Sequence, residues 1–261
     1  MEVQFDGTPD GCLCAVAWAL QHSGEISISA REDSNGTADL FANQTPFIPT
    51  ESEQADALFR QLQHAGGKEA ARNVLRSLMV MPPGQANALL KYTRLVLKHG
   101  SAVDRLHADP DVAFIHKSAR KVSHEIHRFK GLLRFSKLRD ERFMAIYEPD
   151  YDITLFLSWH FARRLRAQHW IILDAKRQCA ATWNGNVINA ETPDRTMLTG
   201  TALQMLLRAC DPDPSDVDVQ EKWRIFHQSI AIENRVNPAL QRRCMPARYW
   251  KHLTEMEPSV G

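Results

Sequence analysis

The sequence predicts an α+β protein that is predominantly helical, with small antiparallel sheets built from hairpins in the centre and a strand–helix unit at the N-terminus. Three observations lead to this prediction. Residues 50–98 have the character of helices, and apolar residues recur at helical spacing from Val112 to Phe129. Alternating segments bounded by turn residues follow Gly131, which is typical of strands. The opening residues pass from an apolar strand through a glycine- and proline-containing turn into a helix.

The first hundred residues contain the strand–helix unit and a helical segment. A strand at residues 2–5 leads through the turn at 6–11 into a helix that reaches Leu20, and residues 26–30 return as a second strand. Residues 50–98 are expected to be mostly helical, with a break at 81–84 because proline interrupts a helix. We expect an N-terminal strand–helix and helical lobe at 1–108 and a central and C-terminal α+β region at 109–261. One continuous domain is the alternative.

The best-defined helix spans residues 109–131. Asp109 is suited to cap it, Pro110 to occupy its first position, and Gly131 to end it. Its apolar residues recur at spacings of three and four, which predicts one buried stripe. The stripe contains Val112, Ile115, Ala119, Val122, Ile126 and Phe129.

Beyond Gly131 the pattern changes to strands joined by helices. The expected strands are a hairpin at 132–137 and 142–148 and a meander at 170–174, 179–183 and 186–189. Asn184-Gly185 is a favoured two-residue turn between the last two strands. One helix is expected to be capped by Asp152 and to reach about Arg166, and another is expected to begin at Asp216.

Composition excludes several classes of protein. The chain has 261 residues, 44% of them hydrophobic and 24% charged, as in ordinary globular proteins. No apolar run approaches the roughly 18 residues of a membrane span, and acidic residues precede the apolar run after Gly11, so we expect a cytoplasmic protein that binds no membrane. The five cysteines are odd in number and scattered, which argues against a disulfide framework. His124 and His127 are three apart rather than four, and nearby cations disfavour a metal, so they do not indicate a zinc enzyme. We predict no metal site and no cofactor.

The net charge of +1 conceals a strongly basic block at residues 117–142, with nine basic and three acidic residues. On a helix each residue advances by about 100°, so Lys117, Lys121, His124 and Arg128 share one face, opposite the apolar stripe. Sequence-independent affinity for nucleic acids comes from such cations. A solvated helix face without function is the alternative. The candidate nucleic-acid-binding residues are Lys117, Arg120, Lys121, His124, Arg128, Lys130, Arg134, Arg163, Arg164 and Arg248.

Several motifs follow one another along the chain: the runs at 127–135 (HRFKGLLRF), 160–164 (HFARR), 170–174 (WIILD), 229–238 (SIAIENRVNP) and 245–251 (MPARYWK). Together they resemble the motifs of a bacterial family described as probable DNA metabolism proteins. The resemblance implies a setting in DNA metabolism or repair, because the region also occurs fused to UdgX-type uracil-DNA-glycosylase-like proteins. It further implies a radical SAM partner thought to modify or repair DNA. This chain has no Cys-x-x-x-Cys-x-x-Cys motif, so any iron–sulfur chemistry would belong to that partner.

Three functions remain open from the sequence. The leading hypothesis is an accessory protein that binds DNA through its basic face and assists the radical SAM partner. The second is an enzyme acting directly on DNA, with Glu148, His160 and Asp174 as candidate catalytic residues beside Asp152 and Arg164. His160 lies within an apolar helical stripe, so a core histidine is the alternative to a pocket histidine. The third is a protein–protein adaptor.

Overall fold

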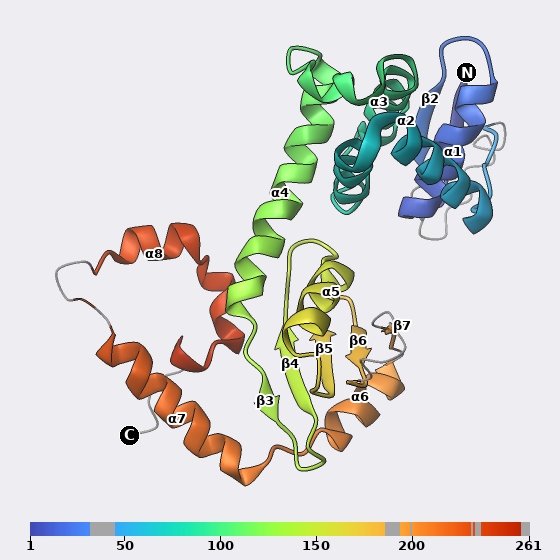
Figure 1. Ribbon diagram of the computed structural model, residues 1–261. Coiled ribbons are helices and arrows are strands. Elements are labelled where there is room, and N and C mark those ends of the chain that lie inside the picture. Colours follow the sequence, from blue (N-terminus) through green and yellow to red (C-terminus); the bar gives the residue numbers. More distant parts are fainter. Residues whose placement is uncertain (32–44, 186–193, 199, 231, 233–235, 257–261) are drawn as a thin grey trace. The chain divides into compact units, whose positions relative to one another are not determined.

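The computed structural model describes residues 1–31, 45–185, 194–198, 200–230, 232 and 236–256 (Figure 1). The chain divides into two compact units, residues 1–123 and 124–261. The division falls within one helix, α4, which runs from Pro110 to Leu132. The predicted fold class is confirmed: the protein is α+β and mostly helical, and it opens with a strand followed by a helix.

The first unit packs helices against a small parallel strand pair. β1 and β2 pair in parallel, with Val3 opposite Ile28. Its core contains fully buried Val3, Leu62, Leu89 and Tyr92. The elements are β1 (Glu2–Phe5), α1 (Pro9–Gln21), β2 (Ser27–Ala30), α2 (Ser52–Leu78), α3 (Gln85–His99) and the 3-10 helix η1 (Gly100–Arg105).

The second unit is built on a five-stranded sheet in the order β3-β4-β5-β6-β7. Its strands are β3 (Ser136–Lys137), β4 (Phe143–Tyr147), β5 (Trp170–Asp174), β6 (Cys179–Trp183) and β7 (Asp194–Met197). Its further helices are α5 (Thr154–Arg164), α6 (Gly200–Ala209), α7 (Pro214–Ser229), α8 (Pro238–Cys244), η3 (Ala247–His252) and η4 (Thr254–Met256).

One pairing in this sheet differs from the expected antiparallel hairpins. β4 and β5 are parallel, with Ala145 opposite Ile172, whereas the other neighbours are antiparallel. The reason is α5, which lies between β4 and β5 in the chain and returns it to the same end of the sheet. Residues alternate between the two faces of β5. Ile171 and Leu173 pack with residues of α6, and Trp170 lies on the other face, near Phe135.

The helix predicted at 109–131 is confirmed as α4. The Asp109 carboxylate accepts hydrogen bonds from the backbone amides of Asp111 and Val112 at 3.0 and 3.1 Å, which caps the helix as expected. All six residues of the predicted apolar stripe are buried. Helical periodicity therefore identified correctly which face of α4 is packed.

Three local predictions beyond α4 need correction or lie outside the structure. α5 begins at Thr154 after Ile153, and no side chain caps it, so Asp152 is not its cap. α7 begins at Pro214 rather than Asp216 because proline suits a first helical position, and Asp213 accepts the Ser215 amide at 2.9 Å. The strand expected at 186–189 lies outside the described residues. No described helix has the length and apolar character needed to cross a membrane.

Candidate functional site

The six candidate nucleic-acid-binding residues of α4 have no carboxylate partner among the residues that the structure describes, and all but Arg128 are exposed. In the first unit these are Lys117, Arg120 and Lys121. In the second unit His124 and Lys130 are exposed and Arg128 is half-buried. The acidic residue within this stretch, Glu125, is only 1% exposed and faces the protein interior. The solvent side of α4 therefore carries positive charge without interleaved carboxylates.

The cations that follow in the hairpin are neutralised instead. Lys137 contacts Glu141 and Asp213 at 2.8 and 3.4 Å. Arg139 contacts Asp211 at 2.7 Å. Arg142 contacts Asp140 at 2.6 Å. The basic block of the sequence is thus divided into an unpaired part on α4 and a paired part after it.

Arg134 belongs to the neutralised group. Its Nε and Nη2 donate to the two carboxylate oxygens of Glu255 at 3.0 and 2.5 Å. Trp223 Nε1 donates to the same carboxylate at 2.9 Å, and the Arg134 guanidinium lies 5.2 Å from the centre of the Trp223 ring. The Glu255 side chain is only 3% exposed. Burial alone would raise the pKa of Glu255, but the hydrogen bonds from Arg134 and Trp223 bring it below its ordinary value.

Beside this ion pair lies a pocket of about 560 Å³, formed by the end of α4, the start of β4, the end of α5, and α7. Its charged lining residues are Lys130, Arg134 and Arg164. Its aromatic lining residues are Phe135, Phe143, Phe161 and Trp223. None of the described residues that line it is acidic. Lys130 and Arg164 have no carboxylate partner among the described residues, so the pocket is electropositive and partly apolar.

His160 lies near the positive charges of Lys130 and Arg164. Its Nε2 atom is buried and makes no hydrogen bond with the described residues. Burial lowers its pKa, and the positive charges of Lys130, Arg164 and Arg163 lower it further. Arg163 itself is exposed, and its Nε donates to the Trp159 carbonyl at 3.3 Å. The lowered pKa favours a neutral His160 beside three cations that have no carboxylate partner among the described residues.

Arg248, a candidate phosphate ligand, is engaged in holding a loop. It donates to both carboxylate oxygens of Asp150 at 3.2 and 2.6 Å, and its guanidinium lies 4.7 Å from the Tyr249 ring centre. Glu125 accepts from the backbone amides of Asp150 and Tyr151 at 2.7 and 2.9 Å and from the Tyr249 hydroxyl at 2.8 Å. Burial raises the pKa of Glu125, although these donors oppose the shift. The contacts give Arg248 and Glu125 a structural role at residues 148–152.

Glu148, a candidate catalytic residue, pairs with the C-terminal segment. Its Oε1 accepts from Lys251 Nζ at 2.5 Å and lies 3.2 Å from His252 Nε2. The Lys251 hydrogen bond, followed by that of His252, lowers the pKa of Glu148, so this carboxylate is not prepared to act as a general acid near neutral pH.

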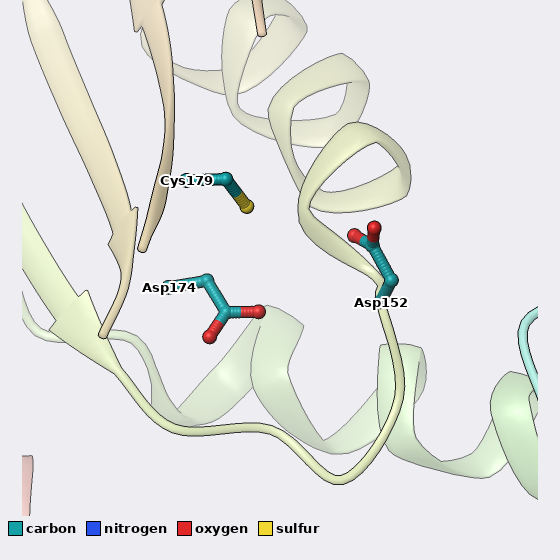
Figure 2. A group of neighbouring side chains, drawn as sticks. All are labelled: Asp152, Asp174 and Cys179. Carbon is teal, nitrogen blue, oxygen red and sulfur yellow. The ribbon is translucent and has the colours of Figure 1, made fainter. Parts of the chain in front are cut away.

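Asp174 lies with Asp152 and Cys179 in a separate cluster (Figure 2). One ligand atom of each falls within 4.8 Å of the others. The register of β5 and β6, which places Asp174 opposite Cys179, brings two of them together. Two carboxylates and a thiol are chemically able to hold a metal ion. However, Asp174 is fully buried and its carboxylate accepts from Arg177 Nη1 at 2.9 Å and from two backbone amides, so its charge is already compensated.

Arg177 extends this cluster to the same loop. Its Nη1 and Nη2 donate to the carbonyls of Pro149 and Asp150 at 3.2 and 2.6 Å. Burial raises the pKa of Asp174, and the hydrogen bonds from Arg177 act against that shift. Asp174 therefore positions Arg177, which in turn fixes the loop that carries Glu148 and Asp152.

The pocket was not predicted from the sequence. Phe135 follows the candidate Arg134 directly, but Phe143 and Trp223 carried no signal that would distinguish them from core aromatics. The partner of Arg134, Glu255, is 121 residues away. The pairing of Asp174 with Cys179 could have been predicted from the sequence, because only four residues connect the two expected strands and their facing ends are these two residues.

Comparison with curated proteins and with solved structures found no match. Comparison with protein families matched one, described as a domain of unknown function, DUF4130, over residues 83–255. The match covers about two thirds of the chain, including α4, the sheet of the second unit and the electropositive pocket. The chain belongs to the DUF4130 family.

Proposed function

We propose that this protein is a DNA-associated accessory protein that binds nucleic-acid phosphates through the cations of α4 and α5 and assists a radical SAM partner in DNA modification or repair. The observation that supports it is a contrast in charge. Lys130 and Arg164 stay unpaired among the described residues, whereas Arg134, Lys137, Arg139 and Arg142 each contact a carboxylate. The DNA setting and the partner rest on the resemblance of the motifs at 127–135, 170–174 and 245–251.

Unpaired cations suit a polyanion for a physical reason. A lysine or arginine that already has a carboxylate partner loses that interaction when it meets a phosphate, and the exchange gives little net affinity. A cation without a carboxylate partner loses no such interaction when it binds a phosphate, and each phosphate contact releases condensed counterions. Binding through Lys130 and Arg164 therefore depends steeply on salt.

The test is fluorescence anisotropy of a labelled DNA duplex with the full chain, between about 50 and 200 mM salt. The double variant Lys130→Gln/Arg164→Gln removes two proposed phosphate contacts. We expect the slope of log K against log salt to become shallower by about 1.8, because each contact contributes about 0.9. Arg139→Gln is the matched control, since it removes one exposed cation that already pairs with Asp211. Lys117→Glu/Lys121→Glu tests two of the other cations of α4.

Two results would overturn the proposal. One is the absence of DNA binding by the wild-type chain at low salt. The other is a slope for Lys130→Gln/Arg164→Gln that equals that of Arg139→Gln. Loss of folding is checked for each variant by its circular dichroism spectrum.

The enzyme alternative receives less support from the geometry. The five residues considered for it are divided among three settings: Glu148 pairs with Lys251 and His252, Asp152 and Asp174 lie with Cys179, and His160 lies with Arg164. General acid–base catalysis needs groups within hydrogen-bonding reach of one reacting atom. The two carboxylates that do lie together, Asp152 and Asp174, include one that is bound to Arg177.

The adaptor alternative is favoured by one specific feature, an exposed apolar stripe along α7. Val219, Phe226 and Ile230 follow one another at spacings of seven and four and are 60%, 51% and 56% exposed. Exposed apolar stripes of this kind are typical of protein–protein contacts. Co-purification with the radical SAM partner in the absence of any DNA binding would support the adaptor function instead of the accessory function proposed above.

A further inference from the structure

The pocket beside Arg134 is lined both by positive charge and by aromatic surface, and few ligands make use of both. Lys130 and Arg164 supply unpaired positive charge. Phe135, Phe143 and Trp223 supply aromatic surface. A bare anion needs only the first, and an apolar ligand needs only the second. A nucleotide, which carries a phosphate on one side and a planar base on the other, uses both.

We propose that this pocket takes up one unpaired nucleotide of a DNA strand, with its base against the aromatic residues and its phosphate at Lys130 and Arg164. The inference rests on the proposed function and specifies its substrate: single-stranded or locally unpaired DNA in preference to an intact duplex. In a duplex the base faces are stacked on one another and are not available to protein side chains.

The size and openness of the pocket fit this ligand. Its volume of about 560 Å³ lies within the range of roughly 300–1,000 Å³ found for small-ligand sites. Trp223 and the half-buried rings of Phe135 and Phe143 retain surface that a base can cover. The Gln168 side chain also lines the pocket and offers an amide donor and acceptor for a base edge.

The aromatic lining is held in place by its neighbours. The Phe135 ring packs edge-on against Phe161, with 5.0 Å between ring centres, and against Trp170 at 6.4 Å. Trp223 is fixed by its hydrogen bond to Glu255 and by the guanidinium of Arg134. Aromatic side chains that are already ordered lose little conformational freedom when a ligand binds. The ion pair of Arg134 and Glu255 therefore serves to position Trp223, while Lys130 and Arg164 supply the net positive charge of the pocket.

The decisive experiment compares three labelled DNA ligands with the full chain: a single-stranded oligonucleotide, the same sequence as a duplex, and a single strand of equal length in which every nucleotide is abasic. Phe143→Leu replaces an aromatic face with an aliphatic side chain. We expect its affinity for the intact single strand to fall at least about five-fold, since base–aromatic stacking makes a contribution of this size. Its affinity for the duplex and for the abasic strand should not change.

Two further variants make the comparison independent of folding. Phe156→Leu is the matched control, because Phe156 is also half-buried in the same unit but does not line the pocket. Gly131→Leu adds a side chain at the pocket lining, where a Cβ atom would meet nothing within 4 Å. It should weaken single-strand binding without removing a cation. Both are compared with wild type for their thermal midpoints.

The outcomes separate the two proposals. If Phe143→Leu and Gly131→Leu bind single strands as wild type does, while Lys130→Gln/Arg164→Gln weakens all DNA ligands, the nucleotide pocket is refuted and phosphate binding stands. If the charge variant changes nothing, both proposals fail. Weaker binding of the intact single strand alone by the two pocket variants supports the nucleotide pocket.

Discussion

The ion pair between Arg134 and Glu255 allows the charge of the pocket to be changed without touching its unpaired cations. Glu255→Gln removes the negative charge from a side chain that is 3% exposed and leaves Arg134 as a third free cation beside Lys130 and Arg164. If single-stranded DNA enters the pocket, one added phosphate contact makes the slope of log K against log salt steeper by about 0.7. At 0.1 M salt this corresponds to binding that is about five-fold tighter.

The same substitution has a cost in stability. Three hydrogen bonds to a charged acceptor are weakened, two from Arg134 and one from Trp223. Hydrogen bonds to charged groups contribute about 1.5–3 kcal/mol each at most, and glutamine retains part of the acceptor, so we expect a loss of about 2 kcal/mol in the free energy of unfolding. If Glu255→Gln binds DNA more tightly although it is less stable, the tighter binding cannot result from improved folding. It must then come from the added positive charge in the pocket.

The assays are anisotropy with a labelled single strand over a salt series and urea unfolding followed by tryptophan fluorescence. Glu141→Gln is the control, since it also removes one negative charge from the second unit, but from an exposed residue paired with Lys137. An unchanged salt slope for Glu255→Gln, in a protein shown to be folded, would refute the placement of DNA phosphates at this pocket.

Three further predictions concern stability. Glu125→Ala leaves the backbone amides of Asp150 and Tyr151 without their acceptor, whereas the Tyr249 hydroxyl keeps Asp150 as its second acceptor. We expect a loss of about 3 kcal/mol in the free energy of unfolding in urea, and a loss below about 1 kcal/mol would contradict the role given to Glu125. The pKa of Glu255 in the folded protein lies below its ordinary value of 4.5, so its contribution to the free energy of unfolding is present above pH 4.5 and is lost as the pH falls. The stabilities of wild type and Glu255→Gln should therefore converge below pH 4.5, which urea unfolding at several pH values checks. Asp174→Asn should lower the thermal midpoint, because Arg177 loses its buried partner, while DNA affinity of the folded variant stays at the wild-type value in the anisotropy assay.

The features that local sequence determines were predicted well. α4 was identified with its cap, its first residue and its buried stripe, because capping and helical periodicity depend on residues within a few positions of one another. The start of α7 was misplaced by two residues because Asp213 and Asp216 are both suitable caps. Pro214 determines which of them caps the helix, because proline is favoured at the first helical position. The direction of β5 relative to β4 depends on how α5 crosses the sheet, which residue spacing does not reveal.

The candidate site depended on contacts over much longer distances. Nine basic residues in one block indicated a continuous cationic surface, yet their carboxylate partners come from residues up to 121 positions away, as with Arg134 and Glu255. Arg248 was among the candidate nucleic-acid-binding residues, but the structure pairs it with Asp150. Charge counted along a chain overestimates a binding surface, because ion pairs form between segments that the count treats separately.

The distribution of these ion pairs bears on function. Four of the later cations in the block have carboxylate partners, so the fold has acidic residues available to neutralise this region. Lys130 and Arg164 remain unpaired among the described residues, close enough to His160 that their charge lowers its pKa. Like charges in proximity destabilise the folded protein unless an anion compensates them. Positive charge retained at the edge of an aromatic pocket is therefore the observation that supports the proposed phosphate contact.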